Sequence, residues 1–273
     1  MKTHQGKAMK AIRTLPLVCL LAAAFAAPAY AGAIHDAGLF TTVLPANDDS
    51  YVGPVSLGFS ANINSTLYSS TYVNNNGNIT FDGGLSTYTP SAISSGAYGP
   101  IIAAFFADVD TRGVGSPVSY GAATLGGYNV FGVNYINVGV YSQQPIFNSF
   151  QMILTDRSDI TAGDFDIQFN YDTIVWDQGA VSSTSALAGY WTSATSNYTL
   201  NGSLVSGAFR DTGPAATSLI QNSLNSNVLG QYNFQVRGGV VQPPNNVPEP
   251  TSLALVGLAL AGLAAARRKQ RAV

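Results

Sequence analysis

Cysteine is almost absent from this chain of 273 residues, in which Cys19 is the only one. It lies in an apolar run near the N-terminus, and Val18 stands where a lipid-modified cysteine requires a small residue. We therefore expect no lipid anchor there. The remaining chain can form no disulfide and carries no reactive thiol. The 216 residues between Gly32 and Val247 are enough to build a stable core without disulfides.

Charged residues are also scarce, and residues 32–247 contain no lysine and no glutamate. This stretch holds four arginines and thirteen aspartates, which gives a formal charge of −9. An anionic surface repels phosphate backbones, so we expect no nucleic-acid partner. His4 belongs to the N-terminal segment, and His35 lies where we expect the chain to fray. The sequence therefore excludes histidine-dependent triads and zinc sites made of His and Cys.

Residues 1–31 have the three-part pattern of a secretory signal peptide. A basic start is followed by the uncharged apolar run 15–27, and Ala29 and Ala31 then form a small-x-small cleavage pattern. The apolar run is too short to span a membrane comfortably. We expect export through the Sec machinery and cleavage after Ala31, which leaves Gly32 as the first residue of the exported protein.

The C-terminal segment combines a linker, an apolar stretch and a group of cations. Prolines make the linker, residues 242–250, extended and accessible. Residues 251–266 are apolar. Of these, the fifteen residues 252–266 would span about 22 Å as a helix, short of the roughly 30 Å hydrocarbon core, and bilayer thinning and snorkelling can cover that gap. Residues 267–273 carry four cations, which stay in the cytoplasm by the positive-inside rule, so the body would lie on the other side of the membrane.

The order of these three parts resembles the PEP-CTERM sorting signal of Gram-negative bacteria. The residues that carry the resemblance are Val247, Pro248, Glu249 and Pro250, followed after the apolar stretch by Arg267, Arg268 and Lys269. The resemblance implies that an exosortase recognises the tail, cuts near the Pro-Glu-Pro, and releases or transfers the body. The transmembrane sorting helix would then hold the protein in the inner membrane only temporarily, before it reaches the cell surface or the extracellular matrix.

Apolar residues in the body alternate with a period of two, which is typical of strands with one buried face. The clearest case is residues 164–171. Its apolar face consists of Phe165, Ile167, Phe169 and Tyr171. The alternation slips near residues 172–173, which indicates a turn or a bulge. Residues 128–141 and 147–155 are apolar on both faces, so we expect central strands that are covered on both sides.

Further strands and turns predict an all-β fold, an antiparallel β-sandwich over residues 32–241. The turn signal at 74–78 is rich in Asn and Gly, which tolerate a positive φ. One short helix is expected at 215–224. The other expected strands lie at 67–73, 78–81, 101–106, 187–191 and 232–236, the last of which we expect to complete the sandwich.

The motifs of the body resemble the NIDO domain, the extracellular module of nidogen. They are "STLYSSTYVNNNGNITFDG" at 65–83, "GPIIAAFFADVDTRG" at 99–113 and "GDFDIQFNYDTIVWD" at 163–177. The resemblance covers about residues 48–207 and is most specific in the Asp-Val-Asp-Thr-Arg run, although Phe106 stands where the family often has a tryptophan. The family is linked to the extracellular matrix, so the resemblance implies a role in cell–matrix adhesion.

Asp108 and Asp110, within that run, are the candidate metal ligands. Two positions apart on an extended strand, they would share a face. One hypothesis is a Ca²⁺ site, because carboxylate oxygens suit hard cations. The other is structural: both carboxylates accept backbone N–H bonds and pair with Arg112 to organise a turn. We favour the structural hypothesis because no dense loop of oxygen ligands is visible, and we expect no other cofactor.

Two functions fit these observations. The favoured one is a non-enzymatic surface protein that serves cell–matrix adhesion or organises exopolysaccharide in a biofilm, by binding through one face of the sandwich. The alternative is a hydrolase that acts on extracellular polysaccharide through paired aspartates. The candidate catalytic aspartates surround an expected hairpin: Asp156, Asp159, Asp164 and Asp166. Accidental pairs are common among thirteen aspartates, so we expect these four to lie in a solvated loop with Asx turns.

Overall fold

The computed structural model describes residues 32–242, which fold almost entirely as β-structure. The strands form two sheets, and every pairing between named strands is antiparallel. The expected all-β class is therefore confirmed. Within residues 32–242, no helix is both long and apolar enough to cross a membrane. The expected signal peptide at 1–31, the expected sorting helix at 251–266 and the sorting residues from Val247 onward lie outside the described residues.

The large sheet has eight strands, in the order β1-β7-β8-β9-β10-β13-β14, with β6 paired to β8. The long central strands β8 and β9 are joined by a hairpin, and so are β9 and β10. The bounds are β1 Thr42–Val43, β6 Val109–Asp110, β7 Ser119–Leu125, β8 Tyr128–Val140, β9 Gln144–Asp156, β10 Phe165–Thr173, β13 Gln231–Arg237 and β14 Val240–Val241. The expected final strand is thus confirmed as β13, which pairs with β10.

The small sheet has six strands, in the order β12-β11-β5-β4-β3-β2. Two short 3₁₀ turns, η1 Ala37–Leu39 and η2 Ile93–Ser95, lie in the connections. The strand bounds are β2 Tyr51–Ile63, β3 Thr66–Asn74, β4 Asn78–Thr80, β5 Ile101–Phe106, β11 Leu187–Ser193 and β12 Ser196–Thr199. The sequence missed β2 and β7, because most of their residues are at least partly exposed and give no clean apolar alternation.

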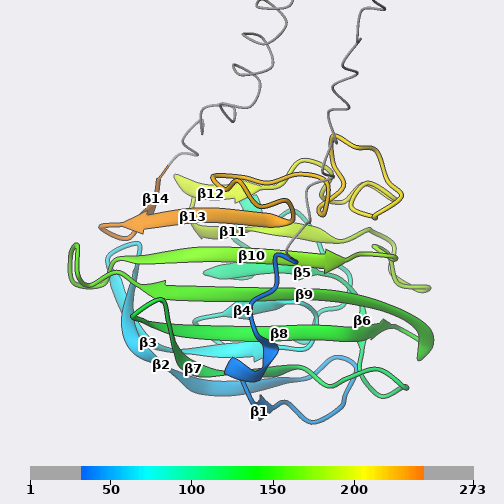
Figure 1. Ribbon diagram of the computed structural model, residues 1–273, viewed down its shortest axis with the longest axis horizontal. Helices are drawn as coiled ribbons and strands as arrows, with labels where there is room; N and C mark the ends of the chain where they lie inside the picture. Colours follow the sequence, from blue (N-terminus) through cyan, green and yellow to red (C-terminus); the bar gives the residue numbers. More distant parts are fainter. Residues whose placement is uncertain (1–31, 243–273) are drawn as a thin grey trace, which may run out of the picture. The chain divides into compact units, whose positions relative to one another are not determined.

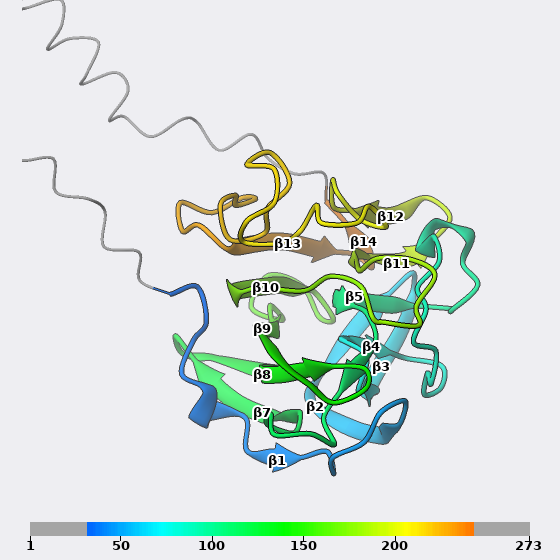
Figure 2. The same ribbon diagram turned by 90° about the vertical axis from the view of Figure 1, so that its right-hand side faces the viewer.

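The two sheets face one another across a single hydrophobic core (Figures 1 and 2). Two tyrosines fix the distance between the sheets. The hydroxyl of Tyr135 on β8 donates to the carbonyl oxygen of Asn74 at 2.8 Å, and that of Tyr171 on β10 donates to the carbonyl oxygen of Ala104 at 2.6 Å. Both side chains are almost fully buried, where a hydroxyl without a partner would be costly.

Strands β8 and β9 are apolar on both faces because other segments also cover the face of the large sheet that points away from the main core. On the outer side of the large sheet, Phe40 packs against Val130 and Ile153 in a separate buried cluster. Figure 1 shows residues 32–41 running across β10, β9 and β8 to reach β1. The outer side of the small sheet has its own cluster, which Ile93 of η2 covers. The prediction of doubly covered central strands is confirmed by the burial of β8 and β9.

Two local expectations were wrong. Residues 215–224 form turns and no helix. The side-chain amide of Asn222 donates to the carbonyl oxygens of Ala215 and Ser218, which would accept from backbone N–H groups in a helix. His35 does not lie in a frayed end. Its backbone N–H donates to Gln151 at 3.1 Å, and its ring Nε2 lies 2.9 Å from Oε1 of Gln168. The turn or bulge expected near residues 172–173 is confirmed by a shift in the β9–β10 pairing register between Tyr171 and Thr173.

Candidate functional site

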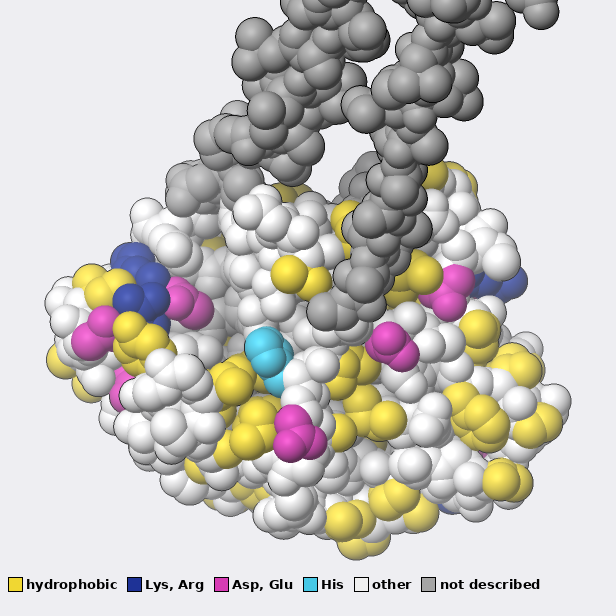
Figure 3. Space-filling view, viewed as in Figure 1, with side chains coloured by type: hydrophobic (Ala, Val, Ile, Leu, Met, Phe, Trp, Pro, Cys, Tyr) yellow, Lys and Arg dark blue, Asp and Glu magenta, His cyan; other side chains and the backbone are white. Residues whose placement is uncertain are grey.

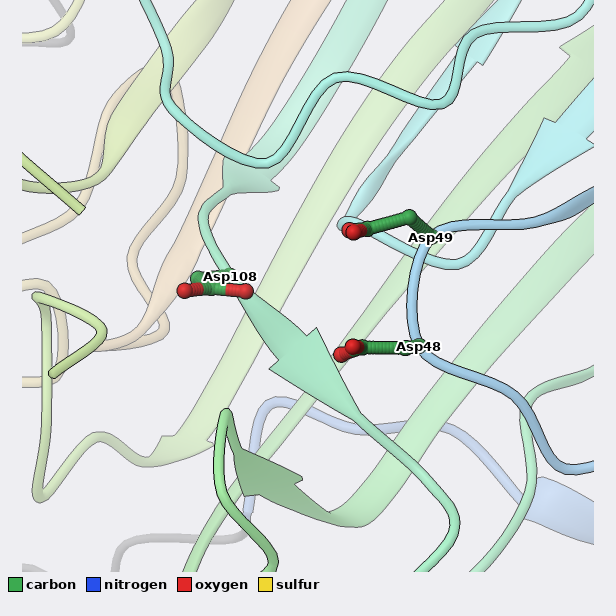
Figure 4. Close-up of side chains that lie close together, drawn as sticks. All are labelled: Asp48, Asp49 and Asp108. Carbon is green, nitrogen blue, oxygen red and sulfur yellow. The ribbon is translucent and has the colours of Figure 1, made fainter. Parts of the chain in front are cut away.

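Three aspartates meet where the chain crosses between the sheets. One crossing, between β1 and β2, carries Asp48 and Asp49; the other, between β5 and β6, carries Asp108. One carboxylate oxygen from each residue lies within 4.8 Å of the other two. Figure 4 shows Asp48 and Asp49 reaching toward Asp108 from the opposite segment. We call this cluster, with the cavity beside it, the acidic pocket.

The cavity of the acidic pocket has a volume of about 180 Å³. Besides the three aspartates it is lined by Tyr88, Tyr141 and Val181. Tyr88 and Val181 are exposed, whereas Asp108 is only 1 % exposed. The pocket is therefore open at its rim and closed at its base, where the carboxylate of Asp108 lies.

The asparagine-rich turn between β3 and β4 is hydrogen-bonded to both segments that form the acidic pocket. The amide of Asn75 donates to the carbonyl oxygens of Asp48 and Val109, both at 2.5 Å. Asn76 donates to Oδ1 of Asp49 at 2.8 Å and accepts from the N–H of Val109 at 2.9 Å. Both asparagines are buried. The sequence indicated a tight turn here, but the turn also holds the two crossing segments together.

Replacing Asn75 should therefore loosen both crossings. In Asn75→Ala, the carbonyl groups of Asp48 and Val109 lose their donor, and we expect a loss of about 1–3 kcal/mol in the free energy of unfolding. Urea denaturation followed by tryptophan fluorescence measures it. The matched control is Asn201→Ala, because Asn201 is exposed and such a substitution changes stability by only about 0.5 kcal/mol. Equal losses in the two variants would contradict this role of Asn75.

Asp108 and Asp110 do not act as a pair. Asp110 accepts from the backbone N–H of Arg112 at 3.0 Å and from its guanidinium at 2.9 and 2.7 Å, as the structural hypothesis expects. The same guanidinium reaches Asp48 at 2.9 Å. Asp108 makes no such contact: it precedes β6, and neither of its carboxylate oxygens has a hydrogen-bond partner among the described residues. The expected shared face is lost because β5 ends at Phe106 and the chain changes sheets before Asp110.

The buried position of Asp108 changes its acidity. Burial, followed by the charges of Asp49, Asp48 and Asp110, raises the pKa of Asp108 to about 7. Burial and the neighbouring carboxylates likewise raise the pKa of Asp48 to about 6, although Arg112 opposes the shift. Burial also disfavours the charged form of Asp110, but its bonds to Arg112 outweigh that cost and hold its pKa below the ordinary value. The acidic pocket therefore concentrates carboxylates without a matching number of cations.

The aspartates around the β9–β10 hairpin are mostly engaged in ion pairs. Arg157 contacts Asp159 at 3.0 Å and Asp166 at 2.8 Å, and Arg237 contacts Asp166 at 2.6 Å. Asp164 is buried and accepts the N–H of Gly238 at 2.8 Å. The expected Asx turn exists at Asp156, which accepts the N–H of Ser158. The expected solvated loop is present at residues 158–162, which are exposed, but Asp164 and Asp166 lie outside it, because β13 brings a second arginine beside this hairpin.

A second candidate surface lies on the outer face of the large sheet. A cavity of about 250 Å³ lies over the paired strands β10 and β13, and we call it the amide groove. It is lined by Thr155, Asp166, Ile167, Gln168, Asn225, Asn233, Phe234, Gln235 and Gln242. Gln168 donates to Oδ1 of Asn233 at 3.0 Å, so the amides at its centre are already oriented. The sequence gave no signal for this groove, because β13 lies far from β10 in the chain.

This outer face is weakly charged. Figure 3 shows mostly neutral polar and backbone atoms with scattered apolar patches. Its charged atoms are a group of arginine and carboxylate atoms beside the β9–β10 hairpin, a second such group at the right-hand side and a few isolated carboxylates. The four arginines of residues 32–242 each contact at least one aspartate. A surface with few free cations suits neutral, hydroxyl-rich ligands better than polyanions.

Two antiparallel sheets packed around one core define a β-sandwich module. The chain belongs to the NIDO-related family, which matches residues 26–231. The match extends beyond the expected 48–207 on both sides. A PEP-CTERM protein-sorting motif matches residues 246–269. The protein is therefore exported, sorted in an exosortase-dependent way through a membrane-held stage, and delivered to the surface or the extracellular space.

Similar proteins include alpha-tectorin of Homo sapiens, which is 27% identical over 230 residues, and alpha-tectorin of Gallus gallus, which is 28% identical over 232 residues. Each match covers 75% of this chain and 10% of the relative. The chain thus spans about a tenth of the length of the curated relatives it matches. No solved structure matches.

Proposed function

We propose that the exported body is a non-enzymatic binding module that holds polysaccharide at the cell surface and so serves cell–matrix adhesion or biofilm organisation. The observation that carries this proposal is the combination, on one chain, of a NIDO-related domain with a PEP-CTERM sorting motif. Such a tail sends the body to the cell surface or the extracellular space, and we propose that it meets exopolysaccharide there. Binding to that polysaccharide would require a surface that recognises sugar hydroxyls.

The amide groove offers the chemistry for that recognition. A carboxamide provides both donors and an acceptor, which matches the mixed hydrogen bonding of hydroxyl groups. Gln235 is exposed at the groove, and its side chain makes no hydrogen bond to any described residue. Its amide is therefore free for a ligand, while the bond between Gln168 and Asn233 holds the neighbouring amides in place.

Removing two amides from the groove should weaken binding without unfolding the protein. For the double variant Asn233→Ala/Gln235→Ala, we expect about tenfold weaker retention on the exopolysaccharide of the host, because each lost hydrogen bond contributes about 0.5–1.5 kcal/mol. Affinity electrophoresis of the exported protein in gels containing that polysaccharide measures the change. Asn129→Ala, an exposed amide at the start of β8, is the control and should bind like the wild type. Equal retention of both variants would rule out the groove.

The alternative, a polysaccharide hydrolase, is favoured by one observation. Asp108 has a pKa raised to about 7 and lies beside Asp48 and Asp49, and a glycosidase needs one protonated and one ionised carboxyl group. Incubation of the protein with the exopolysaccharide, followed by an assay for new reducing ends, separates the two functions. Binding without reducing ends supports the proposal. Reducing ends that disappear in Asp108→Asn would replace it with the alternative.

A further inference from the structure

We propose that Asp48, Asp49 and Asp108 together bind one divalent cation, Ca²⁺, in the acidic pocket. One carboxylate oxygen from each residue lies within 4.8 Å of those of the other two. Ca²⁺ binds oxygen at about 2.3–2.6 Å, so two ligands on opposite sides of one ion are about 4.6–5.2 Å apart. All three carboxylates can therefore reach a single ion at their present spacing. The inference concerns a site away from the amide groove and does not depend on the proposed function.

The unpartnered state of Asp108 is the second, independent observation. Its side chain is 1 % exposed, and neither carboxylate oxygen has a hydrogen-bond partner among the described residues. Oδ1 of Asp48 is buried and unpartnered in the same way. Buried polar atoms are almost always hydrogen-bonded, and a buried charge without a partner is costly. A cation in the pocket would give these three oxygens the partner that the protein does not provide.

The charge balance of the pocket also favours a cation. Asp110 adds a fourth carboxylate beside the three ligands, and Arg112, which contacts Asp48 and Asp110, is the cation that balances part of this charge. Four carboxylates and one guanidinium leave an excess of three negative charges when all are ionised. Arg112 contacts only Oδ2 of Asp48, so Oδ1 of Asp48 remains available to a metal ion.

The form of the pocket favours Ca²⁺ over Mg²⁺. Ca²⁺ accepts six to eight oxygen ligands in flexible geometry, whereas Mg²⁺ demands a near-ideal octahedron. The three carboxylates come from two connecting segments of irregular backbone, which favours irregular coordination. The cavity of about 180 Å³ leaves room for waters to complete the shell.

Binding at this position would connect the two sheet crossings. Asp48 and Asp49 lie on the passage from the large to the small sheet, and Asp108 lies on the passage back. An ion held by both segments closes one end of the sandwich. The expected consequence is a higher melting temperature, because a ligand that binds only the folded state stabilises it.

Melting of the purified exported protein, first in EDTA and then in Ca²⁺, tests the inference. At Ca²⁺ concentrations one hundredfold above Kd, we expect Tm to rise by about 5–10 °C. In Asp108→Asn, the buried charge is gone, so we expect a Tm in EDTA at least as high as that of the wild type and no rise with Ca²⁺. A wild-type Tm that Ca²⁺ leaves unchanged would overturn the site.

The matched control is Asp159→Asn. Asp159 lies beyond the opposite end of β9, a strand of thirteen residues that begins beside the pocket, about 40 Å away along the strand. This variant should keep the full Ca²⁺ response. If Asp108→Asn and Asp159→Asn respond alike, the ion acts elsewhere, and the inference is wrong.

A second readout reports on the position of the ion directly. Tb³⁺ replaces Ca²⁺ at oxygen sites and luminesces when a nearby tyrosine is excited, and Tyr88 and Tyr141 line the pocket. We expect Tb³⁺ luminescence that Ca²⁺ suppresses by competition and that Asp49→Asn reduces at least tenfold. This variant keeps the buried Asp108 unchanged, so the test remains valid if Asp108→Asn fails to fold. Luminescence that Asp49→Asn leaves unchanged would count against the pocket.

Discussion

A chain truncated before Val247 is expected to remain soluble in the periplasm and to be absent from the cell surface. The truncation removes the PEP-CTERM motif that matches residues 246–269 and, with it, the apolar stretch and the cations that hold the protein at the membrane. The effect should be close to complete, because the signal peptide alone directs export but not sorting. Cell fractionation followed by immunoblotting measures it, with the intact chain as reference.

A second variant separates membrane retention from cutting. Replacing Pro248, Glu249 and Pro250 by alanine keeps the apolar stretch and the cations. We expect this protein to stay in the inner membrane at full tail length, as shown by intact mass. The truncated chain is thus not retained in the membrane, whereas the alanine variant is retained there but not cut. If either of them reaches the surface as efficiently as the intact chain, or if surface material still carries Arg267, the sorting role assigned to the tail is incorrect.

Gly77→Ala is expected to be the most damaging small substitution in the body, with a loss of about 2–5 kcal/mol in the free energy of unfolding. Gly77 has a φ of +77°, and a β-carbon there would collide with the carbonyl oxygen of Phe105 on β5. The left-handed conformation costs about 1–2 kcal/mol for alanine, and overpacking adds about 1–3 kcal/mol. Because the backbone of Gly77 also bonds to Phe105, neither segment can move away easily. Urea denaturation measures the loss.

Gly126→Ala provides the control for this effect. Gly126 has a φ of +60°, similar to that of Gly77, but a β-carbon at this position would meet no atom within 4 Å. Only the conformational cost remains, and we expect about 1–2 kcal/mol. The difference between the two variants therefore isolates the contact with Phe105. Equal losses would show that the close approach of β5 to the turn does not matter for stability.

Most of the regular structure could be predicted from local patterns. The run "DFDIQFNY" alternates strictly and forms β10, and the double-faced apolar runs form β8 and β9. Strand β2 was missed because most of its thirteen residues are at least partly exposed and include Gly53 and Pro54, so that no periodic apolar face marks it. At residues 215–224 we predicted a helix that does not form. There the side-chain amide of Asn222 donates to backbone carbonyl groups that would accept from N–H groups in a helix.

The candidate sites were harder to predict because their residues are distant in sequence. The Asp-Val-Asp-Thr-Arg run led to Asp108 and to the pairing of Asp110 with Arg112, which the structure confirms. It could not indicate Asp48 and Asp49, since nothing in a sequence says which loops of a sandwich meet. The adjacent aspartates at 48–49, between two polar residues, were the only signal, and many surface loops have that composition.

The sequence alone determined where this protein goes and what kind of fold it has. Both follow from local features: apolar runs, cleavage and sorting motifs, and the two-residue alternation, each of which acts within one short segment. The tertiary structure decided where ligands can bind. The acidic pocket needs two crossings brought together by sheet pairing, and the amide groove needs β13 beside β10. The physical reason is that a binding site depends on distances across the fold, which are set only when the two sheets pack around their common core.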